Sequence, residues 1–175
     1  MQDFSLSGRR AFVTGANTGI GQAIAVALAQ AGAEVTLAGR SPASETLALI
    51  PDARDLRLDL SDPMAAAPHV AGGDYDILIN NAGTIRRAEA LDFTEADWDA
   101  VMDVNLKALF FTAQAFGRAL VARGAKGAIV NIASLLSFQG GIRVASYTAA
   151  KHGVAGITKI LANEWASRGI NVNAI

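Results

Sequence analysis

Short apolar runs suited to strands alternate with segments of helical periodicity along the whole chain, and this alternation restricts the fold more than any other feature. Strands separated by helices are typical of βαβ units, which place their strands in one parallel sheet. We expect strands over 10–14, 34–38, 55–58, 77–80, 128–133 and 170–175, and helices over 19–31, 46–50, 97–123 and 147–167, with a weakly helical stretch over 62–70. The sequence therefore predicts a doubly wound, Rossmann-type α/β fold, with a parallel sheet between two layers of helices.

Composition and charge exclude several other classes of protein. The chain has 175 residues, of which 51% are hydrophobic, so we expect residues 1–175 to form a single domain with a sizeable core. The net charge is −1 and the basic residues are scattered, which argues against nucleic acid as a partner. With no cysteine, the chain has no disulfides or thiolate metal sites, and we expect no bound metal. Neither a signal peptide nor a membrane-spanning run is apparent, so we expect a cytoplasmic protein without a membrane partner.

A glycine-rich stretch, TGANTGIG at 14–21, falls where the first strand passes into the first helix. Gly15 suits the positive φ of a tight turn, and Gly19 and Gly21 lack the Cβ that would keep a ligand or a strand at a distance. The N-terminus of the following helix offers free N–H groups to a pyrophosphate. The spacing G-x-x-x-G-x-G differs from the commoner G-x-G-x-x-G, and a tight turn without a ligand is the alternative. The dinucleotide contacts that we expect here are Gly15, Asn17, Thr18, Gly19, Ile20 and Gly21.

The residues after the second strand indicate which dinucleotide binds. An acid there holds the ribose 2′-hydroxyl of NAD, whereas an arginine accommodates the 2′-phosphate of NADP. Here the strand is followed by Arg40 and no carboxylate, and a guanidinium can bind a phosphate with two parallel hydrogen bonds. The sequence therefore favours NADP, with a solvated Arg40 as the alternative. Asp59, just past the third strand, is a candidate adenine contact or else an N-cap or turn acid.

Further polar residues follow the fourth and fifth strands, at the edge where open α/β sheets bind ligands. The segment 80–83, NNAG, follows the fourth strand, and Ser134 follows the fifth. Tyr147 and Lys151 open the next helix with an i, i+4 spacing, so both side chains project from one face. Asn105 lies inside the long predicted helix, where asparagine is a poor helix former without an evident local purpose.

The spacing of Tyr147 and Lys151 has a chemical use. A free phenol titrates near pH 10, and an ammonium one helical turn away stabilises the phenolate. Tyr147 would then exchange a proton with an alcohol or a carbonyl as hydride moves, and Ser134 would hydrogen-bond the same oxygen. The Asn105 amide is expected to hold a water on a path from Lys151 to solvent. A lone Tyr-x-x-x-Lys is usually an amphipathic helix face, so the prediction depends on the whole set of motifs in this order.

These motifs resemble those of the short-chain dehydrogenases/reductases. The resemblance spans the whole chain and rests on TGANTGIG, Asp59-Leu60, NNAG, Asn105, Ser134 and YTAAK at 147–151. It implies a doubly wound parallel sheet and hydride transfer between NAD(P) and an alcohol or ketone. A dinucleotide-binding protein without turnover is the alternative from another functional class.

The resemblance also implies a role for each matched residue. Tyr147 is the expected acid/base, and Lys151 is expected to favour its ionised form and to bind the nicotinamide ribose. Ser134 is expected to orient the substrate, and Asn105 to support the proton relay. The residues expected to line the cofactor cleft are Asp59, Leu60, Asn81, Ala82 and Gly83.

Three longer stretches resemble family members that act on sugar acids: NNAGTIRRAEAL, IASLLSFQGGIRVASYTAAK and LANEWASRGINVNAI. A sugar acid carries a carboxylate, so we expect Arg143 or Arg86 to bind it, with a surface arginine as the alternative for each. Gln139 lies in the loop between Ser134 and Tyr147 and is expected to bind substrate hydroxyls. Such members usually use NAD, whereas Arg40 favours NADP. A gluconate dehydrogenase and a 3-oxoacyl reductase are the alternatives within the family.

Family members are substantially longer than this chain, which stops after the predicted sixth strand. The resemblance therefore implies that the C-terminal part of the usual fold is missing, including a Pro-Gly segment, the substrate lid and the last strand. It also implies a homotetramer, or a homodimer, assembled through the long helices around Asn105 and over 147–165.

Overall fold

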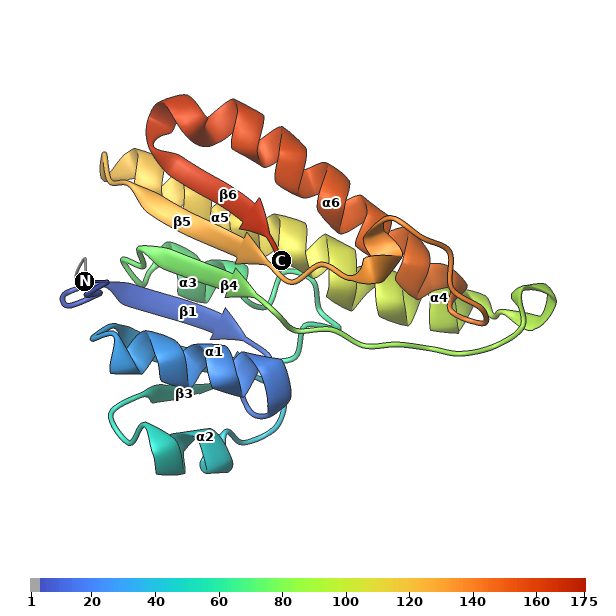
Figure 1. The fold of residues 1–175 in the computed structure, drawn as a ribbon, viewed down its shortest axis with the longest axis horizontal. Coiled ribbons are helices and arrows are strands. Elements are labelled where there is room, and N and C mark those ends of the chain that lie inside the picture. The colour runs from blue at the N-terminus through green and yellow to red at the C-terminus, as the bar shows by residue number, and fades with distance from the viewer. Residues whose placement is uncertain (1–3) are drawn as a thin grey trace.

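The computed structural model describes residues 4–175 and contains one six-stranded sheet in the order β3-β2-β1-β4-β5-β6, in which all neighbouring strands are parallel. The strands are β1 (Arg10–Thr14), β2 (Glu34–Gly39), β3 (Arg54–Arg57), β4 (Ile77–Asn80), β5 (Gly127–Asn131) and β6 (Ile170–Ala174). The strand order reverses between β1 and β4 (Figure 1), so the carboxyl ends of these two strands form the switch point where such sheets bind ligands. The predicted doubly wound parallel sheet is confirmed.

Helices connect the strands and cover both faces of the sheet (Figure 1). They are α1 (Gly19–Gln30), α2 (Ser44–Leu49), α3 (Ala67–Ala71), α4 (Glu95–Met102), α5 (Ala108–Ala122) and α6 (Ala145–Trp165). Four short helical segments complete the list: η1 (Ala90–Asp92), η2 (Asp103–Lys107), η3 (Leu135–Ser137) and η4 (Ala166–Arg168). The helical stretch predicted over 62–70 is shorter in the structure. It is limited to α3, which begins one residue before Pro68.

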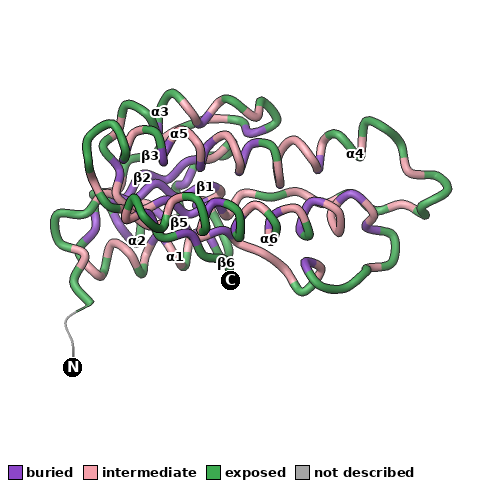
Figure 2. Tube along the Cα trace, turned by 90° about the horizontal axis from the view of Figure 1, so that it is seen from above, coloured by how far each residue is buried: buried purple, intermediate pink, exposed green. Residues whose placement is uncertain are grey.

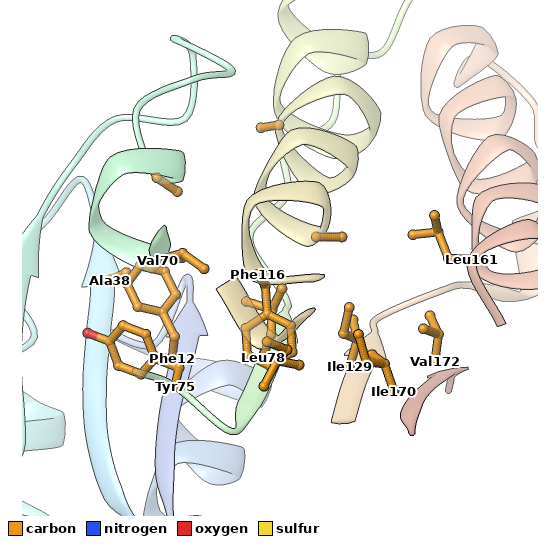
Figure 3. Close-up of a cluster of buried hydrophobic side chains, with 14 of the residues drawn as sticks. Phe12, Ala38, Val70, Tyr75, Leu78, Phe116, Ile129, Leu161, Ile170 and Val172 are labelled. Atoms are coloured by element: carbon orange, nitrogen blue, oxygen red, sulfur yellow. The ribbon is translucent and has the colours of Figure 1, made fainter. Parts of the chain in front are cut away.

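The core has two halves, one on each face of the sheet, and β1 contributes to both. Phe12 belongs to the cluster under α3, α5 and α6 (Figure 3), whereas Ala11 and Val13 pack with α1 and α2 on the opposite face. Successive strand residues point to opposite faces, so an apolar run of this kind is buried on both sides. The buried residues gather along the strands (Figure 2). Burying a side chain such as Phe12 contributes about 1.5–3 kcal/mol to the free energy of folding.

The helix predicted over 97–123 is not continuous. A π-helical turn, η2, separates α4 from α5 and contains Asn105, which is buried. A π turn accommodates an extra residue within an otherwise α-helical course, and such turns are frequent at functional sites. Hydrophobic periodicity does not reveal a single turn of this kind, so the sequence predicted one long helix.

A line of buried polar side chains fixes α6 against the sheet. Asn80 Nδ2 donates to Asn131 Oδ1 at 2.9 Å, and Asn131 Nδ2 donates to Thr158 Oγ1 at 3.0 Å. Thr158 in turn donates to the carbonyl of Val154 at 2.8 Å. Since buried polar groups need partners, this line favours one register of α6 on β4 and β5. It thereby positions the N-terminal end of α6, which carries Tyr147 and Lys151.

Candidate active site

The glycine-rich turn has room for a ligand on one side only. Gly15 and Gly19 have left-handed backbone, with φ of 65° and 60°. A Cβ on Gly21 would lie 2.2 Å from the carbonyl oxygen of Gly15, so only glycine fits there, whereas a Cβ on Gly19 would meet nothing within 4 Å. Thr18 precedes α1 without a side-chain cap, and the first turn of α1 has no acid. The start of α1 therefore retains its affinity for an anion such as a pyrophosphate.

Hydrogen bonds from Thr14 and Asn81 tie the turn to β4. Thr14 Oγ1 accepts from the backbone N–H groups of Asn81 and Ala82, both at 3.0 Å. Asn81 Nδ2 donates to the carbonyl oxygens of Thr14 and Gly15, at 3.0 and 2.9 Å. The Asn81 side chain thus connects the glycine-rich turn to the end of β4. Sequence reasoning missed the role of Thr14, although a hydroxyl at the end of a buried strand is a signal for it.

Thr46 of α2 holds the other side of the turn. Its completely buried hydroxyl donates toward the carbonyls of Ala16 and Asn17, at 2.8 and 3.1 Å, and accepts from Gln22 Nε2 at 3.2 Å. The turn is therefore held in shape by contacts from α1, α2 and β4 without any ligand. No feature of the local sequence around residue 46 identified this contact.

A cleft of about 260 Å³ opens beside the turn at the switch point. Of the expected cofactor contacts, it is lined by Gly15, Asn17, Arg40, Asp59, Leu60, Ala82 and Gly83. Thr18, Gly19, Ile20, Gly21 and Asn81 belong to the surrounding turn and to the end of β4 but do not line the cleft. The remaining expected contacts, Tyr147 and Lys151, lie on α6 and do not line it either. A glycine-lined cleft beside an uncapped helix start fits the phosphates and the adenosine of a dinucleotide.

The end of the cleft near β2 carries the Arg40 guanidinium. Arg40 is exposed there and makes no direct ion pair within residues 4–175. Asp59 Oδ1 accepts from the Ser61 N–H at 2.9 Å. That hydrogen bond is the main reason why the pKa of Asp59 lies below its ordinary value. Desolvation acts in the opposite direction and raises the pKa, whereas a hydrogen bond from the Ser61 side chain and the charge of Arg40 lower it further. Asp59 therefore makes the contact of a turn acid next to Arg40, and both residues line the cleft.

Tyr147 and Lys151 lie together on one face of α6, as the spacing predicts. The Lys151 Nζ is 5.6 Å from the centroid of the Tyr147 ring and donates to the carbonyl of Ile132 at 2.5 Å. Lys151 is only 5% exposed, and burial lowers its pKa from 10.5 to about 8. At neutral pH it is therefore mostly an ammonium with little water around it.

Ser134 follows β5 and caps η3. Its Oγ accepts from the Leu136 N–H at 3.1 Å, and its own N–H donates to Ser137 Oγ at 3.2 Å. Because the Oγ already accepts this backbone hydrogen bond, the hydroxyl proton is free to be donated to another oxygen. Ser134 therefore follows the strand next to β4, at the carboxyl edge of the sheet, with a donor available.

The Asn105 side chain bonds to the backbone of the segment after β4. Its Oδ1 accepts from the Thr84 N–H at 2.7 Å, and its Nδ2 donates to the Thr84 carbonyl at 2.8 Å. Both ends of the amide therefore have backbone partners. The Asn105 side chain thereby fastens the segment after β4 to the π turn.

The segments after β4 and β5 extend beyond the ends of the strands (Figure 1) and contact each other. The Ala88 N–H donates to the carbonyl of Arg143 at 3.2 Å, and Arg143 Nε lies 2.6 Å from Glu89 Oε1. Arg86 Nε lies 3.2 Å from Asp97 Oδ1. Both arginines expected to bind a substrate carboxylate thus have acidic partners, which sequence reasoning did not foresee.

Gln139 is exposed in the loop after β5, where the sequence places it. Phe138 and Ile142 are also exposed in this loop. Within residues 4–175, no group of three or more metal-binding side chains comes together, and no helix is long and apolar enough to cross a membrane.

A parallel sheet with a glycine-rich turn at its switch point and a Tyr-x-x-x-Lys pair at its carboxyl edge defines a dinucleotide-dependent oxidoreductase. The family comparison agrees, because the pattern of the short chain dehydrogenases matches residues 9–175. The chain belongs to this family and is a short-chain dehydrogenase/reductase enzyme.

Relatives of known name share much of the sequence. The chain is 49% identical to the 2-dehydro-3-deoxy-D-gluconate 5-dehydrogenase of Escherichia coli (strain K12), over 98% of this chain and 72% of that enzyme. It is 64% identical, with a TM-score of 0.97, to the crystal structure of a putative 2-deoxy-d-gluconate 3-dehydrogenase from Agrobacterium tumefaciens with bound NADP, covering 99% of this chain and 72% of that one. A putative NAD(P)-dependent gluconate 5-dehydrogenase from Beutenbergia cavernae, with NADP at low occupancy, is 47% identical with a TM-score of 0.93, over 98% and 72% of the two chains.

Proposed function

We propose that the protein interconverts a secondary alcohol and a ketone on a sugar acid by NADP-dependent hydride transfer. The substrate that we propose is 2-dehydro-3-deoxy-D-gluconate, the substrate in the name of the E. coli relative. The observation that carries the proposal is the buried Lys151 ammonium beside the Tyr147 ring, at the sheet edge that also carries Ser134.

The proposed proton chemistry uses three side chains. When bound, the nicotinamide supplies or accepts the hydride. Tyr147 takes the proton of the substrate hydroxyl during oxidation and returns it to the carbonyl oxygen during reduction. Lys151 stabilises the phenolate form and binds the nicotinamide ribose, and Ser134 donates its free hydroxyl proton to the substrate oxygen. Asn105 acts through Thr84, since it fixes the segment that borders the cleft.

The proposed preference for NADP is supported by Arg40 at the end of the cleft near β2. Arg40 lines the cleft, and the tip of β2 has no carboxylate to bind a ribose 2′-hydroxyl. Two of the similar solved structures contain NADP, which agrees with this interpretation. The alternative, NAD, is the usual cofactor of the family members that the longer stretches resemble.

A carboxylate on the substrate is proposed to bind Arg143 or Arg86. Both arginines are paired with acids, but their side chains are 62% and 46% exposed. Exposed ion pairs contribute only about 0–1 kcal/mol, so a substrate carboxylate can replace Glu89 or Asp97 at little cost. Gln139 is proposed to contact hydroxyl groups of the same substrate. Gluconate is the second candidate substrate, because a relative that is 47% identical carries the name of a gluconate 5-dehydrogenase.

The test is a substrate panel read by the absorbance of the reduced nicotinamide. The hydroxy compounds are assayed with oxidised NADP and NAD, and the thioester with the reduced forms of both. The panel contains 2-dehydro-3-deoxygluconate, gluconate, a 3-oxoacyl thioester, and a polyol of matched length without a carboxylate. We expect the highest kcat/KM for the first compound with NADP, and a clear loss for the polyol. Preference for the polyol or for the thioester would overturn the sugar-acid assignment.

We also propose that the protein assembles as a homotetramer through the outer faces of α5 and α6. A groove of about 810 Å³ between these helices is lined by Phe110 and Trp165, with exposed Val121 and Ile160 in the same lining. Light scattering of the wild type and of Ile160→Glu tests the proposal. We expect a tetramer that dissociates in the variant; a homodimer would correct the stoichiometry, and a monomeric wild type would overturn the proposal.

A further inference from the structure

We infer that Arg57 is a positioning residue for cofactor selection, because it holds the turn after β2 in the shape that presents Arg40 to the 2′-phosphate of NADP. The inference rests on the proposed NADP dependence. Arg57 does not line the cleft, so its effect on the ligand passes through Arg40.

The contacts of Arg57 converge on one carbonyl group. Arg57 is the last residue of β3 and is in register with Gly39, the last residue of β2. Its Nε donates to the carbonyl oxygen of Arg40 at 3.1 Å, and its Nη2 donates to the same oxygen. The next residue, Leu58, donates its N–H to the carbonyl of Gly39 at 3.1 Å. The Arg57 side chain and the Leu58 backbone together therefore fasten the last residue of β2 and the first residue of the turn.

The carboxylates of the nearby acids Asp55 and Asp59 accept hydrogen bonds from backbone N–H groups. Asp55 Oδ2 accepts from the Ala43 N–H at 3.3 Å, and Asp59 Oδ1 accepts from the Ser61 N–H at 2.9 Å. Neither Arg40 nor Arg57 forms a direct ion pair in the part of the chain that the structure describes. The turn thus has two guanidinium groups without a direct ion pair, next to the single carboxylate of Asp59, and such groups remain available to a phosphate.

The turn after β2 begins without a buried side chain, so it needs an external support. Gly39 has no side chain that restricts the backbone, and Arg40 and Ser41 are exposed. Without the fork from Arg57, we expect the Arg40 side chain to sample more orientations, which weakens binding of the 2′-phosphate but leaves the rest of the dinucleotide unaffected. Because the contacts are exposed, the expected loss is about five- to tenfold in affinity.

The experiment measures binding by calorimetry, without turnover. Adenosine 2′,5′-bisphosphate and 5′-AMP are titrated into the purified wild type and into Arg57→Gln, Arg57→Lys and the control Arg54→Gln. Arg54 is exposed at the other end of β3, in register with Thr36. We expect Arg57→Gln to bind the bisphosphate about five- to tenfold more weakly, with AMP affinity within about twofold, and Arg54→Gln to match the wild type.

Two further variants separate positioning from charge. Lysine retains the charge at position 57 but cannot form the two-bond fork, so we expect Arg57→Lys to lose most of the same affinity. Full recovery in Arg57→Lys would overturn the positioning role. In an Arg40→Gln background, Arg57→Gln should cause no additional loss, because its effect passes through Arg40. Additive losses would also overturn the inference.

The outcomes distinguish this inference from the proposed cofactor preference. If the wild type binds the bisphosphate no better than AMP, the NADP proposal fails and this inference fails with it. If the wild type prefers the bisphosphate and Arg40→Gln abolishes the preference, but Arg57→Gln behaves as the wild type, only the role of Arg57 is refuted.

Discussion

Replacing Lys151 by methionine is predicted to stabilise the cofactor-free protein at neutral pH. The Lys151 ammonium is 5% exposed, and its single hydrogen bond goes to the carbonyl of Ile132. Burial lowers its pKa from 10.5 to about 8. Since one pKa unit corresponds to about 1.4 kcal/mol, holding this charge in the folded state costs about 3 kcal/mol. Methionine keeps the apolar stem without the charge. However, the loss of the hydrogen-bond donor to Ile132 reduces the gain in stability by about 1–2 kcal/mol.

The net gain is therefore about 1–2 kcal/mol at pH 7, and it depends on pH in a defined direction. The pKa of the folded state lies below that of the unfolded chain, so between about pH 8 and 10.5 the unfolded chain holds a proton that the folded protein has released. The stability of the wild type consequently rises with pH in this range, and below about pH 8 the full penalty remains. The advantage of Lys151→Met should thus disappear near pH 10.

Urea unfolding followed by circular dichroism measures both effects. Wild type, Lys151→Met and the control Lys159→Met are compared at pH 7 and at pH 10 without cofactor. Lys159 is exposed on the same helix, so its variant should differ little from the wild type at either pH. A stability difference between the wild type and Lys151→Met that is the same at both pH values would refute the reasoning.

Three further predictions follow from the same contacts. Arg40→Asp should shift the ratio of the kcat/KM values for NADP and NAD toward NAD by at least about tenfold, because a carboxylate binds the 2′-hydroxyl and repels the 2′-phosphate; an unchanged ratio would remove Arg40 from cofactor selection. Gly21→Ala should abolish dinucleotide binding in a titration, because its Cβ would lie 2.2 Å from a carbonyl oxygen of the turn, whereas Gly156→Ala, with nothing within 4 Å, should bind normally; normal binding by Gly21→Ala would contradict the close packing. Asn131→Ala should lower the free energy of unfolding by about 2–4 kcal/mol in urea, since it leaves the buried Asn80 Nδ2 without an acceptor and removes the hydrogen bond to Thr158, and a loss below about 0.5 kcal/mol would contradict a role for this line.

The sequence sufficed for the order and type of the main elements because each has a strong local signal. Each predicted strand is present within a few residues of its expected bounds, and the i, i+4 spacing correctly placed Tyr147 and Lys151 together. The break in the helix over 97–123 could not be predicted, because one π turn leaves the hydrophobic pattern nearly unchanged.

The contacts that hold the site together join residues distant in the chain and have no local signal. Asn105 meets Thr84, and Arg143 meets Glu89, across 21 and 54 positions of sequence. Spacing within one helix or loop says nothing about such partners. For this reason the sequence identified Asn105 and Arg143 as candidate site residues but not their partners. In the structure Asn105 is hydrogen-bonded to Thr84, and Arg143 forms an ion pair with Glu89.

The most direct test of the proton chemistry is the rate of hydride transfer in Tyr147→Phe, measured together with its affinity for NADP. The matched control is Tyr75→Phe, because the Tyr75 hydroxyl contacts Thr36 inside the core and is not part of the proposed site. If the Tyr147 hydroxyl exchanges the proton, the rate in Tyr147→Phe falls by about 10³-fold or more while NADP binds within about threefold of the wild type, and Tyr75→Phe retains its turnover. Hydride transfer at the wild-type rate in Tyr147→Phe would contradict the mechanism.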